Sequence, residues 1–181
     1  MEPTNRRPIL KLGHVDLGVE TAHLPNGVTI ELAVIRHPGA SAIVALDADG
    51  NIALLSQYRH AIGGYMREVP AGCRNPGEDF LVCARRELAE EAGLSAARWD
   101  RTGAIITIPS VCDEVIELFL ARDLSDGAGV PDHDEVISVS RVPFEETFEM
   151  IRRGEIVDAK SIAALYRARD FLELEGRAGK K

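Results

Sequence analysis

Cysteine is scarce in this chain of 181 residues, which contains only three. These residues, Cys73, Cys83 and Cys112, form no C-x-x-C pair and show no zinc-binding spacing. An odd and sparse set of cysteines fits a reducing compartment. The cysteine content therefore predicts a cytoplasmic protein.

Long apolar runs and an excess of positive charge are also missing. No apolar run approaches the length of a transmembrane helix, and residues 1–8 lack the apolar core of a signal peptide. Lysine and arginine number 21 against 29 aspartates and glutamates, a net charge of −8. This balance argues against a nucleic-acid partner, which would require a basic stripe, and no membrane partner is expected. An anionic small substrate remains compatible if metal ions and a few arginines offset the repulsion.

What the chain does contain suits one globular domain built from strands and helices. Apolar residues make up 45% and charged residues 28%, as in ordinary soluble proteins, and the length allows a sizeable core. Strands are predicted on either side of two turn sequences, Pro25-Asn26-Gly27 and Asp47-Ala48-Asp49-Gly50. The strands cover residues 9–24, 28–36, 41–47 and 51–57. A loop over 58–66 and a short strand over 67–70 follow.

The later part of the chain combines a strong helix with further strands and helices. A helix is predicted from Glu78 or Asp79 to Gly93, with acidic residues at its start and glycine at its end. Asp158 is a candidate N-cap for the final helix. The other predicted segments are strands over 101–108, 114–122 and 135–141, a loop over 125–134, and helices over 143–153 and 158–173. This order predicts an α+β fold, a mixed sheet with helices.

Three glutamates of the predicted central helix carry the clearest chemical signal. Glu87, Glu90 and Glu91 lie at positions i, i+3 and i+4, so they project toward one face. Like charges at this spacing repel each other and destabilise a helix. The pattern therefore predicts a bound cation, and carboxylate ligands favour Mg²⁺, Mn²⁺ or Ca²⁺ over zinc. The alternative interpretation is a solvated acidic helix face.

The stretch from Gly72 to Leu94 resembles the Nudix box, G-x5-E-x7-R-E-U-x-E-E-x-G-U, in which U is a bulky aliphatic residue. Every specified position matches, through Gly72, Glu78, Arg86, Glu87, Leu88, Glu90, Glu91, Gly93 and Leu94. The resemblance implies the Nudix fold, an α/β/α sandwich around a mixed sheet. It also implies hydrolysis of a diphosphate linkage with Mg²⁺, for which Mn²⁺ can substitute.

Segments outside the box resemble one branch of this family, the ADP-ribose pyrophosphatases. They are Gln57-Tyr58-Arg59, the run from Arg67 to Gly72, and the run from Ile156 to Ile162. The branch cleaves nucleoside diphosphate sugars, which implies hydrolysis of ADP-ribose to AMP and ribose 5-phosphate. One alternative is a GDP-mannose or broad-specificity nucleotide-sugar hydrolase. Another is a non-catalytic Nudix module that senses a ligand or binds a partner, although such modules usually lose box glutamates.

The resemblance implies roles for individual box residues. The implied metal ligands are the main-chain carbonyl of Ala71 and the carboxylates of Glu87, Glu90 and Glu91. Glu91 is also expected to be catalytic. Arg86 is expected to orient Glu78 or Glu90 through bidentate hydrogen bonds rather than to contact substrate. Glu78 is expected to act through a water molecule or to hold the start of the helix.

The residue that activates the attacking water is expected in a loop after the box helix. Glu114 lies at the matching place, but the chain has Ser110-Val111-Cys112 where the family commonly has Ser-Pro-Gly. The loop can therefore follow a different path. The candidate bases are Glu114, Asp113 and a box glutamate. Glu114 could instead be a metal ligand or a solvated loop residue.

Substrate binding is expected around the first of these flanking segments. Arg59 is the candidate for binding substrate phosphate through its planar guanidinium. Glu68 is expected to contact the base or ribose edge, or to cross a subunit boundary. The alternative for both is a surface charge at a strand end. Tyr58 and Tyr65 are candidates for stacking on adenine or for packing on the sheet.

The branch also implies a quaternary arrangement. Its members are typically homodimers whose N-terminal strands reach the partner's site. Residues 1–40 are therefore expected to form a dimerisation arm, and residues 41–175 the hydrolase domain, in one structural unit with that arm. Residues 176–181 are expected to be frayed.

Overall fold

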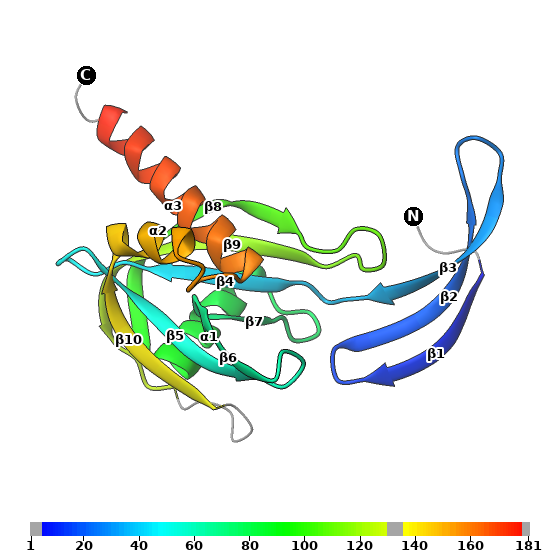
Figure 1. Cartoon of the computed structure of the whole chain (residues 1–181), viewed down its shortest axis with the longest axis horizontal. Helices are drawn as coiled ribbons and strands as arrows, with labels where there is room; N and C mark the ends of the chain where they lie inside the picture. Colours follow the sequence, from blue (N-terminus) through cyan, green and yellow to red (C-terminus); the bar gives the residue numbers. More distant parts are fainter. Residues whose placement is uncertain (1–4, 130–135, 179–181) are drawn as a thin grey trace.

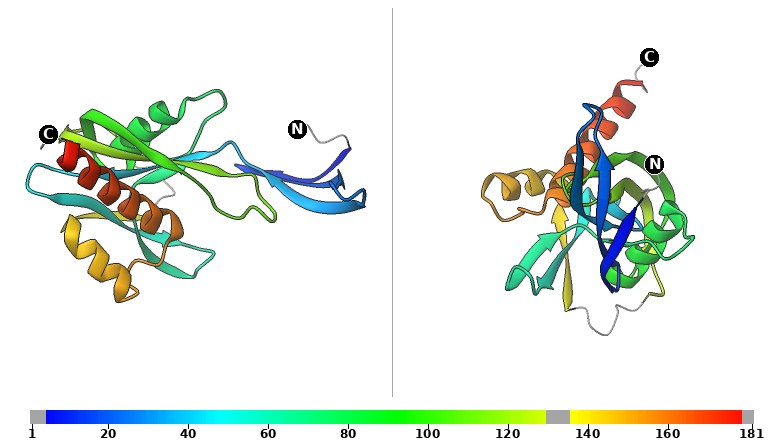
Figure 2. Two further views of the ribbon diagram at one scale, coloured as in Figure 1. Left: turned by 90° about the horizontal axis from the view of Figure 1, so that it is seen from above. Right: turned by 90° about the vertical axis from the view of Figure 1, so that its right-hand side faces the viewer.

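The computed structural model describes residues 5–129 and 136–178. Its first three strands form an arm beside the body of the molecule. β1 (Arg6–Leu12), β2 (Val15–His23) and β3 (Thr29–Arg36) pair in this order as an antiparallel sheet. The arm, residues 6–36, projects away from the remaining elements, and β3 leads directly into the body (Figures 1 and 2).

A four-stranded mixed sheet forms the centre of the body. Its strands are β4 (Ala40–Ala45), β7 (Ala71–Cys73), β8 (Leu94–Ile106) and β9 (Val115–Asp126), in the order β7-β4-β9-β8. β4 runs parallel to β9, whereas the other two pairs are antiparallel. A second sheet has the order β10-β5-β6, with β5 (Asn51–Arg59), β6 (Gly64–Glu68) and β10 (Ile137–Pro143). The prediction of a mixed sheet with helices is confirmed.

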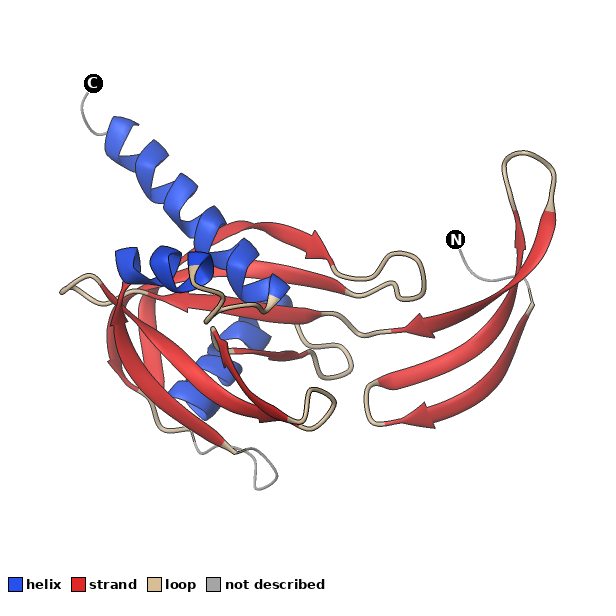
Figure 3. Cartoon of the chain, in the orientation of Figure 1, coloured by secondary structure: helices blue, strands red, loops and turns tan. Residues whose placement is uncertain are grey.

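Two cores cover the two faces of β4, whose six residues are all buried. On one face, Ala42 and Val44 pack in a cluster with residues of α2 (Phe144–Arg152) and α3 (Ala159–Ala178). On the other face, Ile43 and Ala45 pack in a cluster with Leu88 of α1 (Phe80–Ala92). Successive strand side chains point to opposite faces, so a strand that is buried along its whole length and apolar except at Ser41 fits between two helical layers (Figure 3).

The box helix α1 begins and ends where the sequence predicts. The side chain of Asp79 caps the helix by accepting a hydrogen bond from the main-chain N–H of Leu81 at 2.8 Å. Gly93 ends the helix in the left-handed conformation, with φ of 63°. Cys83, Ala84 and Leu88 are buried, and the glutamates of the cleft described below project from the adjoining side of the helix.

Other predicted segments need correction. Residues 9–24 form two strands because the chain reverses at Gly13, whose positive φ suits a tight turn. The predicted loop over 58–66 is shorter, since β5 extends to Arg59 and β6 begins at Gly64. The strand predicted over 67–70 is confirmed for residues 67 and 68 and wrong for residues 69 and 70, because β6 ends at Glu68. The strand predicted over 101–108 is longer and begins earlier, because β8 starts at Leu94 and ends at Ile106. The strand predicted over 114–122 continues further, because β9 ends at Asp126.

The end of the chain also differs from prediction. Helix α3 continues to Ala178, so fraying from residue 176 is wrong for residues 176–178. The carboxylate of Glu175 forms ion pairs with Arg98 of β8 and Arg122 of β9, which hold the last turns on the sheet. Residues 179–181 lie outside the described residues, as do residues 130–134 of the predicted 125–134 loop, whose first two residues belong to β9. Within the described part of the chain, no helix is both long and apolar enough to cross a membrane.

Candidate functional site

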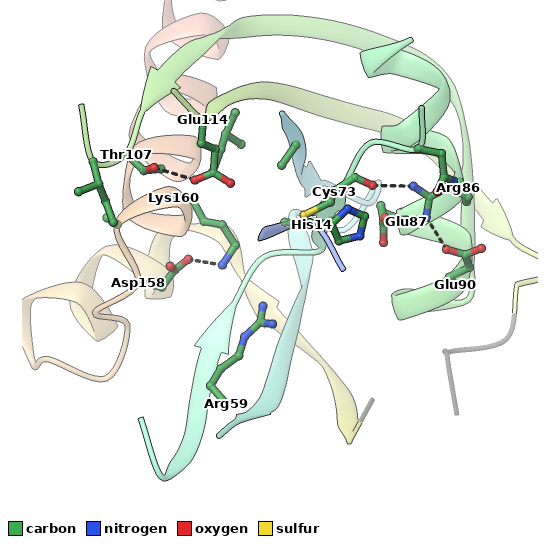
Figure 4. Close-up of a pocket in the computed structure, with 17 residues that line it drawn as sticks. His14, Arg59, Cys73, Arg86, Glu87, Glu90, Thr107, Glu114, Asp158 and Lys160 are labelled. Atoms are coloured by element: carbon green, nitrogen blue, oxygen red, sulfur yellow. Dashed lines mark hydrogen bonds and ion pairs between the residues drawn. The ribbon is translucent and has the colours of Figure 1, made fainter. Parts of the chain in front are cut away.

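A cleft of about 680 Å³ lies between the middle of α1, the end of β5, the start of β9 and the start of α3 (Figure 4). One of its residues, His14, comes from the turn between β1 and β2 of the arm. The remaining lining residues are Ala40, Arg59, Ala71, Gly72, Cys73, Asn75, Arg86, Glu87, Glu90, Thr107, Ile108, Glu114, Ile116, Asp158, Ala159 and Lys160. The cleft therefore gathers most of the residues singled out from the sequence.

The first wall of the cleft is the acidic face of α1 and the adjoining strand β7. Glu87 and Glu90 line the cleft, while Glu91 is 3% exposed and accepts a hydrogen bond from the N–H of Ala71 at 2.7 Å. The carboxylate of Glu87 lies so close to Gly72 that an added Cβ would stand 2.1 Å from it. Glycine is therefore required at this position for the carboxylate to reach the strand.

Arg86 joins these carboxylates. Its Nε and Nη2 donate to the two oxygens of Glu78, each at 3.0 Å, and its Nη1 donates to Glu87 and Glu90 at 2.6 and 2.9 Å. Nη2 also donates to the carbonyl of Cys73 at 2.9 Å. The hydrogen bonds from Arg86 lower the pKa of Glu78 despite opposing desolvation. Bidentate contact with Glu78 is the geometry expected for an orienting arginine.

The first wall can be tested for its fit to a divalent cation. Among the described residues, no three His, Cys, Asp or Glu side chains converge as metal ligands. Arg86 and the N–H of Ala71 bind the carboxylates of Glu90 and Glu91. The donor set nevertheless fits a hard cation, since Glu87, Glu90 and Ala71 line one side of the cleft. The missing Cβ of Gly72 keeps that side open.

The opposite wall contains Glu114, at the end of residues 107–114, which we call the base loop. Thr107 donates its hydroxyl hydrogen to one oxygen of Glu114 at 2.6 Å. The Nδ1 atom of His37 lies 3.4 Å from the other oxygen. The Glu114 side chain is 20% exposed and faces the cleft across from the glutamates of α1 (Figure 4).

Asp113 points elsewhere, although it precedes Glu114 in the chain. One of its oxygens accepts from Arg36 at 3.0 Å, and the other accepts from the main-chain N–H of His37 at 2.8 Å. It does not line the cleft. Of the two adjacent acids considered as the base, the structure brings only Glu114 to the cleft.

Arg59 and Glu68 lie together at a third side of the cleft. Arg59 lines the cleft and donates two hydrogen bonds to Glu68, at 2.9 and 2.7 Å. Glu68 is 2% exposed and lies behind Arg59 rather than in the cleft wall. Although burial opposes ionisation, contacts with Arg59 and Lys160 lower the pKa of Glu68. Glu68 is therefore placed to hold the guanidinium of Arg59 in the cleft wall rather than to contact a ligand in the cleft.

Lys160 is a cleft residue that the sequence analysis missed. Its Nζ donates to Glu68 and, at 2.9 Å, to Asp158. Asp158 caps α3 as predicted, accepting from the N–H of Ser161 at 2.9 Å. The segment that resembles the pyrophosphatases contains Lys160, but its partner Glu68 is 92 residues away in the sequence. Thr107 and His37 were missed for a different reason, because neither belongs to a motif.

Other side chains near the cleft have limited roles. Tyr58 and Tyr65 contact each other edge to face, with ring centroids 5.5 Å apart, and neither lines the cleft. This geometry favours packing over stacking on a ligand. Burial, followed by the nearby charges of Glu114 and Glu87, raises the pKa of Cys73 to about 11. Its thiol is therefore protonated at neutral pH and is a poor nucleophile.

Comparison with known proteins matches residues 35–165 to the NUDIX domain model. The chain is 35% identical over 153 residues to the ADP-ribose pyrophosphatase of Bacillus subtilis, covering 83% of each chain. It is 33% identical over 152 residues to the GDP-mannose pyrophosphatase of Cronobacter sakazakii, covering 78% of this chain and 76% of that one. A crystal structure of an ADP compounds hydrolase matches with a TM-score of 0.82 at 22% identity, covering 96% of this chain and 95% of that one. This last likeness concerns the fold and confirms the predicted layered architecture.

Proposed function

Because this chain belongs to the Nudix family and is a hydrolase of the Nudix type, we propose that it cleaves the pyrophosphate bond of a nucleoside diphosphate sugar. ADP-ribose is the first candidate substrate, and its products would be AMP and ribose 5-phosphate. GDP-mannose is the second, supported by the similarity to a GDP-mannose pyrophosphatase. The observation that carries the proposal is one cleft with carboxylates of α1 on one wall and Glu114 on the other.

We propose that Mg²⁺, or Mn²⁺ in its place, binds to Glu87, Glu90, Glu91 and the carbonyl of Ala71. Such a cation, when bound, neutralises charge on diphosphate oxygens and lowers the pKa of a coordinated water. Arg86 would hold Glu90 toward the cleft and keep the start of α1 in place through Glu78. The hydrogen bond from Ala71 would orient Glu91.

Arg59 and Lys160 are proposed to bind the negatively charged diphosphate of the substrate. Both line the cleft and both are held by the buried carboxylate of Glu68. This arrangement restricts the two flexible side chains before substrate arrives, so less conformational entropy is lost on binding.

Glu114 is proposed to be the general base. A carboxylate oxygen of Glu114 would take a proton from the attacking water, while the hydroxyl of Thr107 holds the other oxygen. Its position across the cleft from α1 supports this role, since substrate bound between the walls would face both sets of groups.

The arm is proposed to join two copies of the chain as a cytoplasmic homodimer. Apolar side chains are exposed along its strands, including Leu10, Leu12 and Val15. Exposed apolar surface of this kind is typical of interaction sites. Sedimentation velocity of the whole chain would test it, and a monomer at micromolar concentration would contradict it.

A substrate screen tests the proposed activity. ADP-ribose, GDP-mannose and other nucleotide sugars would be incubated with the enzyme and Mg²⁺ or Mn²⁺, and the released phosphomonoesters measured. We expect the highest kcat/KM with ADP-ribose. If no diphosphate compound is cleaved, the enzymatic proposal fails and a ligand-sensing role would replace it.

A further inference from the structure

The base loop is attached to the arm as well as to the body of the molecule. The N–H of Ile35, in β3, donates to the carbonyl of Val111 at 2.7 Å, and the N–H of Asp113 donates to the carbonyl of Ile35 at 3.3 Å. Ile35 and Cys112 form a parallel bridge between these hydrogen bonds. The path of the loop just before Glu114 is therefore set by the end of an arm strand.

An ion pair reinforces this attachment. Arg36 donates to Asp113 at 3.0 Å, and the adjacent N–H of His37 occupies the other oxygen of the same carboxylate. Desolvation raises the pKa of Asp113, but the hydrogen bonds from Arg36 and from the N–H of His37, together with the positive charge of Arg36, lower the pKa overall. Both oxygens of Asp113 are thus bound to the junction between the arm and the body.

Arg36 is itself held from the arm side. Its Nε donates to one oxygen of Glu20 at 2.9 Å and its Nη2 to the other at 2.5 Å. The side chain of Glu20 is only 8% exposed and also accepts from Arg6 at 3.2 Å. A guanidinium that donates two hydrogen bonds to a buried carboxylate has little freedom to move, so Arg36 can hold the loop in place.

We propose that Arg36 is a positioning residue for Glu114, acting through Asp113 to set where the carboxylate of Glu114 stands in the cleft. The inference rests on the proposed function, in which Glu114 is the base. The hydrogen bond between Thr107 and Glu114 joins two residues of the same loop, so it moves with the loop and cannot replace an outside anchor. Arg36 itself does not line the cleft, which separates its role from substrate binding.

A double-mutant cycle tests this coupling. We expect Arg36→Gln to lower kcat for ADP-ribose by about tenfold to a hundredfold, the range for a displaced catalytic group, with KM nearly unchanged. In a Glu114→Gln background the same substitution should cause almost no further loss, because the group it positions is already disabled. Equal losses in both backgrounds, or a change in KM alone, would overturn the inference.

Two further variants make the test specific. Asp113→Asn, which keeps the shape of the anchor, should lower kcat in the same direction by a smaller factor, and it serves if Arg36→Gln does not fold. Arg141→Gln is the matched control, because Arg141 is a similarly exposed arginine that pairs with Asp47 at 3.4 Å, and neither residue lines the cleft. Its kcat should equal that of the wild type.

Hydrogen exchange provides a readout that needs no turnover. Amides of the base loop should exchange faster in Arg36→Gln than in the wild type, while those of α1 stay unchanged. Unchanged exchange in the loop would overturn the anchoring role even in an active enzyme. If the wild-type chain cleaves no diphosphate, the proposed function fails instead. Faster exchange in the loop of Arg36→Gln would then show that Arg36 anchors the loop, but it would say nothing about catalysis.

Discussion

The two walls of the cleft present carboxylates to the same space but are built in different ways. On α1, the spacing of Glu87, Glu90 and Glu91 along one helix places them together, and Arg86 of the same helix binds two of them. On the base loop, Glu114 depends on contacts with β3, and Arg36 lies 77 residues before the Asp113 that it holds. The comparison shows that a helix can carry its site within one motif, whereas a loop takes its shape from distant partners.

The largest expected effect comes from the helical wall. Glu91→Gln should lower kcat by about 10⁴-fold, because a cation site contributes several kcal/mol to transition-state stabilisation. The fold should survive, since the glutamine carbonyl can still accept from the N–H of Ala71. Circular dichroism and steady-state kinetics would measure both. Glu149→Gln, on the exposed side of α2, is the control, and near-normal activity of Glu91→Gln would exclude the box as the metal site.

A smaller loss is expected on the loop wall. Glu114→Gln should lower kcat by at least about 10²-fold, the contribution of a general base, and should leave the hydrogen bond from Thr107 in place. A loss of less than about tenfold would rule out Glu114 as the base and would make the helical wall the source of proton transfer.

Gly72→Ala separates function from stability on the helical wall. The new Cβ would displace the flexible end of Glu87, so the Mg²⁺ concentration for half-maximal activity should rise about 10- to 100-fold. The free energy of unfolding should change by less than about 1 kcal/mol, because only a side-chain terminus has to move. Gly176→Ala, in open space on α3, is the control. Unchanged Mg²⁺ dependence would mean that Glu87 is not a ligand.

The smallest expected effect is on acid stability. The folded-state pKa of Glu78 is lowered from its ordinary value of 4.5, chiefly by hydrogen bonds from Arg86. Its contribution to stability is therefore present above about pH 4.5 and is lost as the pH falls through the folded-state pKa. Urea unfolding from pH 7 down to about pH 3 should show a shallower loss for Glu78→Gln than for the wild type. Identical curves would show that this ion pair contributes no pH-dependent stability.

Features that depend on residues close together in the sequence were predicted, whereas those that depend on distant residues were not. A helix start at Glu78 or Asp79, a helix end at Gly93 and bidentate contact of Arg86 with Glu78 or Glu90 were expected, because each of these features joins residues within one short segment. The burial of Glu68 behind Arg59 was not expected, since its second partner, Lys160, comes from the far end of the chain. The reversal at Gly13 was missed because alternating apolar residues continue on both sides of it.

The sequence by itself determined the acidic helix, because helical periodicity and end capping act over three or four residues, and its match to the Nudix box implied the family and the layered fold. Only the tertiary structure decided which acid of the 107–114 loop faces the cleft and which lysine stands beside Arg59. These choices depend on contacts between β3 and the loop, and between β6 and α3. The physical reason is that such contacts leave no local sequence pattern, because each charged side chain pairs with a residue that is distant in the sequence and is brought near only by folding.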